Sequence, residues 1–509
     1  MHARVGLGAL AALALAARGA PARAPAAAPA PAASFSSVPH MVYNWSRDHC
    51  PRYAPMPPAA CVPDILEHCD PDVPDACTRA WAPAAGGVRM LGSVDGVSRL
   101  QTGASLVALA HNCSAVYANA TYDADPAHFR GHEWVEAPAV VSADAVFALT
   151  HVDTHDARGA YLYTSITLFA SADGGATFAP ARPPPGHLVA ATPYDNSNLS
   201  TGVQGVGFGM PSSVLRDPAT GLFYVMLLSS WGENVRGQKG GLCLLRTADI
   251  SDPGSWRAWN GSAFSATLNA SPLLGPVPYP DAHTCEPLRD AAGDVLAMRH
   301  LSLLWSSFYK RYLLFGEASG AGALGGRGWA FSLSDDLLNW SVPAAVDTAG
   351  MIDEAGNATV APMVPTPGRF IKTAGGHTHW EEPSGAWKAP VGSCTPCPGL
   401  NACAAAQELP PDAFNAIANA TFAFECTHVY KTQGYINYVY SVLVDDAAHA
   451  ATGADPSFNI VGQDAALFLV AKKCAGARWD QKAPLPACSP LDGYGRDQRD
   501  IVRAAIHFT

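Results

Sequence analysis

The sequence predicts an all-β protein. Short runs of β-branched and aromatic residues alternate with turns rich in Gly, Pro, Asp and Asn, and no segment has the periodicity of an amphipathic helix. The chain also repeats one plan several times: an apolar strand, a tight turn, a second strand, a loop, a third strand, and then S-x-D with an aromatic residue. Both observations favour a fold built from antiparallel meanders.

The copies of this plan can be followed along the chain. They cover residues 96–123 (the weakest copy), 137–178, 211–259, 300–340 and 427–479. Five copies, each a four-stranded meander, predict a five-bladed β-propeller over residues 88–480, with residues 481–509 as a C-terminal closing segment. A sandwich or jelly roll of similar strand content is the alternative.

One turn sequence, Ser171 to Phe178 (SADGGATF), matches the Asp-box pattern S-x-D-x-G-x-T-[FW]. Asp173 can cap the turn amides, Gly174 and Gly175 can take the backbone angles of a tight hairpin, and Phe178 can bury its ring. The motif stabilises a hairpin and carries no chemistry. Equivalent outer turns are expected at Asp173, Asp249 and Asp335.

The beginning of the sequence predicts export. Residues 1–24 have a basic start, an apolar run from Val5 to Ala17 and small residues, as in a signal peptide. Residues 25–39 are rich in Pro and Ala, and we expect a leader that cannot build a core. Sequons that suggest a glycosylated surface occur at Asn44, Asn112, Asn119, Asn198, Asn260, Asn269, Asn339, Asn357 and Asn419. A secreted, extracellular protein is expected.

The 13 cysteines also fit an oxidising compartment. Residues 40–87 form a Pro-rich stretch with little core of its own, and disulfides would stabilise it as an arm packed outside the propeller. Its cysteines are Cys50, Cys61, Cys69 and Cys77. A second group comprises Cys394, Cys397 and Cys403, for which disulfides are favoured and a zinc site is the alternative.

Charge and hydropathy exclude some partners. The net charge is −11 and the basic residues are scattered, which argues against a nucleic-acid-binding surface. The apolar run near the start is too short to span a bilayer, and no later segment is long and apolar enough. We expect a monomer that acts on an oligo- or polysaccharide, without a cofactor; a structural calcium ion is left open.

Two segments resemble five-bladed glycoside hydrolases, namely family 43 and its invertase and levansucrase relatives. They are Phe331 to Trp340 (FSLSDDLLNW), similar to a blade hairpin of that family, and Glu136-Ala137-Pro138, similar to its inner-strand openings. The resemblance covers residues 88–480 at the level of repeat plan. It implies three carboxylates at the centre of the propeller: a general base, a carboxylate that tunes pKa and orients the sugar, and a general acid.

Alignment of the repeat turns assigns positions to this implied site. Glu136 of the second copy aligns with Asp95 of the first and Glu425 of the fifth, and the fourth copy offers His300. The third copy departs from the family pattern, because Gly209 stands where the catalytic Glu is implied. Arg216-Asp217-Pro218 resembles an invertase motif, but Asp217 between two apolar strands is better read as a hairpin turn.

Loops after second strands should lie at the same end as the starts of the inner strands, so they are further candidates. In the second copy this loop carries His151 and Asp153 at alternate positions, a sugar clamp or a ligand group; a solvated loop with incidental histidines is the alternative. The third copy carries Trp231, Glu233 and Arg236, a flat ring beside charged groups as in sugar sites. The fourth copy ends its second strand with Glu317.

These observations predict a secreted glycan-active protein, with glycoside hydrolysis favoured. Asp95 would be the base, Glu136 the orienting carboxylate and Glu233 the substitute acid. The substrate-binding residues would be His151, Asp153, Trp231, Arg236, His300 and Glu425. A non-catalytic propeller that binds a glycan or a protein partner is the alternative, favoured by Gly209.

Overall fold

The computed structural model describes residues 30–36, 39–44, 48, 74–94, 96–118, 123, 125–155, 161–195, 206–229, 238–296, 298–318, 328–351, 369–372, 378–381, 437–445, 455–473 and 498–509. Residues 32–509 form one compact unit. The elements described in it are mostly β-strands, as predicted. The others are short 3-10 turns: η2 (Pro126–His128), η3 (Pro253–Ser255), η4 (Pro272–Leu274) and η5 (Pro280–His283).

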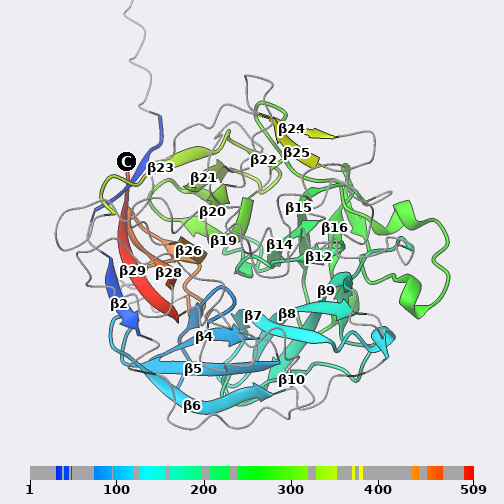
Figure 1. Ribbon diagram of the computed structural model, residues 1–509, viewed down its shortest axis with the longest axis horizontal. Coiled ribbons are helices and arrows are strands. Elements are labelled where there is room, and N and C mark those ends of the chain that lie inside the picture. The colour runs from blue at the N-terminus through cyan, green and yellow to red at the C-terminus, as the bar shows by residue number, and fades with distance from the viewer. Residues whose placement is uncertain are drawn as a thin grey trace, which may run out of the picture. The chain divides into compact units, whose positions relative to one another are not determined.

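The first two strand groups are antiparallel meanders in chain order (Figure 1). The first group runs β3 (Arg79–Trp81), β4 (Val88–Val94), β5 (Val97–Gly103) and β6 (Leu109–Ala118). The second group runs β7 (His132–Val140), β8 (Val146–His155), β9 (Tyr161–Ser171) and β10 (Ala179–Pro180), and β11 (Leu188–Ala190) also pairs with β9.

The third group follows the same plan with its first strand divided in two. It consists of β12 (Phe208–Gly209) and β13 (Leu215–Arg216), which both pair with β14 (Phe223–Ser229), followed by β15 (Gly241–Thr247), β16 (Arg257–Trp259) and β17 (Phe264–Ala266).

The fourth and fifth groups are joined into one 12-stranded sheet. The fourth contains β18 (Arg289–Asp290), β19 (Met298–Ser306), β20 (Arg311–Ala318), β21 (Gly328–Ser334), β22 (Asn339–Trp340) and β23 (Ala344–Asp347), with β27 (Ile460–Val461) parallel to β19. The fifth contains β26 (Asn437–Val444), β28 (Asp464–Lys473), β29 (Gln498–Phe508) and β2 (His40–Tyr43). The joining strand is β1 (Ala33–Phe35), between β29 and β23. A separate hairpin consists of β24 (Arg369–Lys372) and β25 (Thr378–Glu381).

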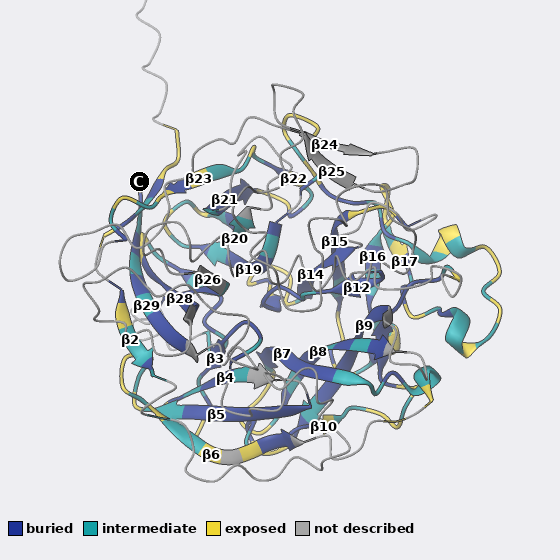
Figure 2. Cartoon of the chain, viewed as in Figure 1, coloured by how far each residue is buried: buried dark blue, intermediate teal, exposed yellow. Residues whose placement is uncertain are grey.

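Hydrophobic packing links each group to the next. Five large clusters of buried residues lie between the first and second, second and third, third and fourth, fourth and fifth, and fifth and first groups. In the last of these, Phe468 of β28 and Tyr43 of β2 pack with Met90 of β4. We call this cyclic order of groups the ring. Two stacked sheets, the sandwich alternative, would not produce it. Figure 2 shows the burial along its strands.

The Asp173 turn has the hydrogen bonds that its sequence predicts. Asp173 Oδ1 accepts from the backbone N–H of Thr177 at 2.9 Å and from Ser171 Oγ at 2.7 Å. Burial acts to raise the pKa of Asp173, but hydrogen bonds from Ser171 and Thr177 outweigh it and lower the pKa to about 2. Phe178 is buried against Trp81.

The other two turns also follow the third strand of their groups, with one correction. The backbone N–H of Asp249 donates to Thr247 Oγ1 at 2.9 Å. In the fourth group Asp336, not the predicted Asp335, accepts from the backbone N–H groups of Leu338 and Asn339, because Ser334-x-Asp336 keeps the spacing of Ser171-x-Asp173. Asp335 instead forms an ion pair with Arg311.

The Asp217 turn is confirmed as a hairpin. Asp217 accepts hydrogen bonds from the backbone N–H groups of Ala219 and Thr220, between β13 and β14. Tyr312 also donates to Asp217 at 2.9 Å.

The structure differs from the predicted boundaries near the chain ends. Residues 33–35, assigned to the leader (25–39), pair as β1 with β29, and Ala33 and Phe35 are buried because their side chains complete a core cluster. The arm (40–87) is likewise divided: β2 pairs with β29 and β3 begins the first group. Within the predicted closing segment (481–509), β29 is a paired strand between β28 and β1. Residues 1–24 lie outside the described residues.

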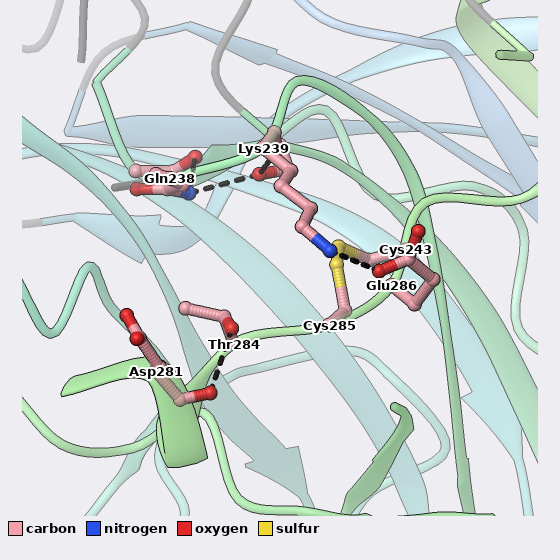
Figure 3. The surroundings of a disulfide bond; sticks show 9 residues. Gln238, Lys239, Cys243, Asp281, Thr284, Cys285 and Glu286 are labelled. Carbon is pink, nitrogen blue, oxygen red and sulfur yellow. Dashed lines mark hydrogen bonds and ion pairs between the residues drawn. A yellow bond between two sulfur atoms is a disulfide. The ribbon is translucent and has the colours of Figure 1, made fainter. Parts of the chain in front are cut away.

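The cysteines differ from expectation in one described case. Cys77 is a free, buried thiol at the start of the first group. Cys50, Cys61, Cys69, Cys394, Cys397 and Cys403 lie outside the described residues. A disulfide that the sequence did not reveal joins Cys243 of β15 to Cys285, beside the Lys239–Glu286 ion pair (Figure 3).

Candidate functional site

The innermost strands of several groups contain a short stretch of irregular backbone. The register of β7 shifts at Glu136, that of β19 shifts around His300, and that of β26 shifts around Tyr440. His300 and Tyr440 have φ of 49° and 54°, and Met210, directly after β12, has φ of 48°. Bulges and left-handed residues re-aim side chains and are enriched at functional sites. Four of the five groups therefore carry such a position near the centre of the ring.

On the second group, an imidazole lies between two carboxylates. His151 Nε2 is 3.0 Å from Asp153 Oδ1, and His151 Nδ1 is 3.7 Å from Glu136 Oε1. Thr164 Oγ1 donates to the same oxygen of Asp153 at 3.2 Å. Burial acts to lower the pKa of His151, but Asp153 and Glu136 outweigh it and raise the pKa to about 10. His151 is therefore an imidazolium at neutral pH.

Gly209 of the third group packs against this histidine. A Cβ at Gly209 would lie 2.9 Å from Thr164 Cγ2 and 3.6 Å from His151 Nε2. A larger side chain would need His151 or Thr164 to move. Local packing therefore explains a glycine at this position, because the absence of a side chain lets β12 approach the second group.

The fourth group supplies a second imidazole–carboxylate pair. His300 Nδ1 lies 2.8 Å from Glu317 Oε2, although the atoms are not aligned for a hydrogen bond. His300 is 9% exposed, and neither ring nitrogen has a hydrogen-bond partner among the described residues. The buried imidazole thus has an ion-pair contact but no aligned hydrogen bond, so its nitrogens remain able to bind a polar ligand.

Asp75, just before β3, connects the first, second and fifth groups. Its carboxylate accepts from Trp134 Nε1 at 3.3 Å and from the Tyr440 hydroxyl at 3.0 Å. The ring of Tyr440 lies edge-on to His300, with centroids 4.7 Å apart. Asp75 and Tyr440 thus link the His151 side of the site to the His300 side.

Cys77 and Arg79 are buried near these side chains. Burial raises the pKa of the Cys77 thiol; Arg79 acts to lower it, while Glu136 and Glu317 act to raise it. Both glutamates are therefore within electrostatic reach of the same thiol. Two carboxylates from different groups, each beside an imidazole, can bind a polar ligand or divide acid and base roles between them.

The structure brings together four of the predicted site residues. Glu136, His151 and Asp153 are in direct contact, and His300 belongs to the same centre through Tyr440 and Asp75. The predicted residues that lie outside the described part of the chain are Asp95, Trp231, Glu233, Arg236 and Glu425.

The first repeat is registered differently from the alignment. β5, which was aligned with the innermost strand of the second group, is the third strand of its own group. The innermost strand is β3, which has three residues, and Asp95 stands between β4 and β5 in the sequence. Asp75, Tyr440 and Arg79 were not predicted. Glu317 was marked by its position at the end of a second strand, which was a usable signal.

Among the described residues, no three His, Cys, Asp or Glu side chains are arranged so that they could hold a metal ion. In the same residues no helix is long and apolar enough to cross a membrane.

No protein-family model and no curated protein matches the chain. Among solved structures, the chain is similar to an N-acetylgalactosamine deacetylase from F. plautii, in complex with blood group B trisaccharide, at 11% identity and a TM-score of 0.39, over 92% of this chain and 95% of that chain. An α-L-arabinofuranosidase from Lactobacillus brevis is similar at 11% identity and a TM-score of 0.32, over 62% of this chain and 87% of that chain. A β-fructofuranosidase from Schwanniomyces occidentalis is similar at 11% identity and a TM-score of 0.32, over 61% of this chain and 50% of that chain.

Proposed function

We propose that this protein is a secreted glycoside hydrolase whose site lies at the centre of the ring. The observation that carries the proposal is the pair of glutamates, Glu136 and Glu317, each beside a histidine and supplied by different groups. Glycoside cleavage uses two carboxyl groups, one that donates a proton and one that acts as base or nucleophile. Glu136, which faces the His151 imidazolium, takes the carboxylate role, and Glu317 takes the proton-donor role.

The other predicted carboxylates belong to the same proposal. The sequence assigns the base role to Asp95 and the acid role to Glu233 instead, with Glu136 as the orienting carboxylate, and both Asp95 and Glu233 lie outside the described residues. Substitution of each one tests whether the site needs them in addition to Glu136 and Glu317. The substrate is an oligo- or polysaccharide, and the protein acts as a monomer.

The architecture that goes with this function is a five-bladed propeller. The cyclic packing of five groups supports it, because each group supplies one blade and β1 and β2 complete the last blade on β29. The Asp173 hairpin is then an Asp-box turn, and Thr247–Asp249 and Ser334–Asp336 are its degenerate equivalents.

Export is supported by the leader sequence, by the Cys243–Cys285 disulfide and by the sequons. Nine of the 15 asparagines stand in sequons. In the described part of the chain, none of the sequon asparagines is buried: Asn44, Asn112, Asn260, Asn269 and Asn339. Expression in a secretory eukaryotic host should give a protein whose mass falls on treatment with an N-glycosidase. An unmodified protein would contradict this part of the proposal.

The deciding experiment is a screen of the purified protein on arabinan, xylan, fructan and aryl glycosides. We expect wild type to cleave at least one substrate and Glu136→Gln and Glu317→Gln to lose activity by orders of magnitude while remaining folded. Glu286→Gln is the matched control, because Glu286 pairs with Lys239 beside the disulfide (Figure 3) and not with the central histidines. Equal activity of all three variants would refute the proposed roles.

A non-catalytic glycan-binding propeller is the second candidate. Gly209 favours it, because the third group has no carboxylate at the position where the family resemblance implies the catalytic acid. Under this alternative wild type would bind a glycan that it does not cleave, and Glu136→Gln would bind equally well.

A further inference from the structure

Arg79 connects three groups across the centre of the ring. It begins β3 in the first group, and its side chain is buried. Its Nη2 donates to the carbonyl oxygen of Pro211 in the third group at 3.0 Å and to that of Leu301 in the fourth group at 2.8 Å. No strand pairing in the described part of the chain joins β3 to either of these groups. One guanidinium thus forms a link that the sheets themselves do not provide.

The two acceptor carbonyls directly follow left-handed residues. Pro211 follows Met210, whose φ is 48°, and Leu301 follows His300, whose φ is 49°. A residue other than glycine in this region is strained, and it persists only where its surroundings fix it. Charge-assisted hydrogen bonds from Arg79 supply such fixation at both places.

Both left-handed residues lie next to the imidazole–carboxylate pairs. His300 itself faces Glu317. Met210 follows Gly209, which packs against His151. A shift of either peptide unit would therefore change the geometry of one pair.

We propose that Arg79 is a positioning residue of the candidate site: its guanidinium holds the backbone that presents His300 to Glu317 and Gly209 to His151. Among the described residues, Arg79 forms no hydrogen bond or ion pair with either pair, so it acts through the peptide units. The effect on turnover rests on the proposed hydrolase function, whereas the effect on His300 does not.

The matched control is Ser213, which also joins the third group to the fourth. Its Oγ accepts from the backbone N–H of Leu303 at 2.9 Å and donates to the Leu303 carbonyl at 2.9 Å. Ser213→Ala removes a buried link between the same groups without touching the carbonyls that follow Met210 and His300. It should therefore lower the melting temperature without altering the site.

The first measurement is NMR of the full chain with 13Cε1-labelled histidine, after assignment of His300 by substitution. The Tyr440 ring lies edge-on to His300 and shifts its signal. Arg79→Met should move this signal, and Arg79→Lys should move it less, because one ammonium can still donate to a carbonyl. Ser213→Ala should leave it in place. If Arg79→Met does not fold, the role of Arg79 is tested by comparing the shift of the His300 signal in Arg79→Lys with that in Ser213→Ala.

The second measurement is turnover on whichever glycan wild type cleaves. We expect kcat/KM of Arg79→Met to fall about a hundredfold, which is the loss that a displacement of the site residues by about 1 Å can cause. Arg79→Lys should recover part of this loss, and Ser213→Ala should not show it. An unmoved His300 signal in the Arg79 variants, or an equal shift in Ser213→Ala, would overturn the inference. If wild type cleaves nothing, only the hydrolase proposal fails, and the NMR result still decides the role of Arg79.

Discussion

Replacing His151 with glutamine should remove a pH-dependent part of the free energy of unfolding. The imidazole lies 3.0 Å from Asp153 and 3.7 Å from Glu136, and its side chain is only 12% exposed. The pKa of His151 is raised from 6.5 to about 10. At about 1.4 kcal/mol for each pKa unit, the folded protein gains on the order of 5 kcal/mol from this proton.

The sign of the pH dependence follows from the direction of the shift. The contribution of His151 is fully present below pH 6.5, where the histidine is protonated in both states. It is lost as the pH rises towards 10, where the folded state releases its proton. The stability difference between wild type and His151→Gln should therefore be largest at pH 6.5 and should fall steadily up to pH 10.

Urea denaturation of both proteins at half-unit steps between pH 6.5 and 10 measures this difference. His128→Gln is the control, because His128 also pairs with a carboxylate but is exposed to solvent. A stability difference between wild type and His151→Gln that does not vary with pH would refute the imidazolium assignment. An NMR titration of His151 near pH 6.5 would refute it independently.

Two further predictions concern stability. Gly175→Ala should destabilise the fold strongly, because its Cβ would lie 2.6 Å from the Trp81 ring at a φ of +88°; Gly221→Ala, with φ of +73° and no atom within 4 Å of its Cβ, should cost only the backbone strain. The difference between their melting temperatures measures the clash, and equal losses would contradict it. Cys243→Ala with Cys285→Ala should lower the free energy of unfolding by about 4 kcal/mol from the loop-closure entropy of the 42-residue separation, measured against wild type under reducing and oxidising conditions. An unchanged midpoint under oxidising conditions would show that the disulfide does not stabilise the fold.

Local features of the fold were predictable from the sequence. The turns at Asp173 and Asp217 depend on side chains that bond to backbone within a few residues, so short motifs identify them. Glu136 was identified because it directly precedes the Ala-Pro of an inner strand. The Asp335 prediction was wrong by one residue, since two consecutive aspartates offer two registers and only the spacing from Ser334 selects Asp336.

Long-range features were not predictable in the same way. The three-residue strand at Arg79 has little hydrophobic signal, and its place in the first group depends on pairing with β4 and on contacts with Pro211 and Leu301. β1 looked like a leader because Ala33 and Phe35 acquire their core only from β23 and β29. Tyr440 and Asp75 meet between the fifth and first groups, which are far apart in the sequence, and no pattern within either segment predicts this contact.

The pairing of β1 and β2 with β29 has a consequence for the order in which the protein can be made. The backbone N–H groups of Ala32 and Thr509 each donate to the carbonyl of the other, at 3.1 and 2.9 Å. During synthesis β2 therefore stays without its partner, and β1 without one of its two partners, until β29 has emerged. Such non-local pairing slows folding, and the interval leaves sheet edges open to wrong partners. Removal of β29 should thus yield an aggregating chain rather than a smaller folded one.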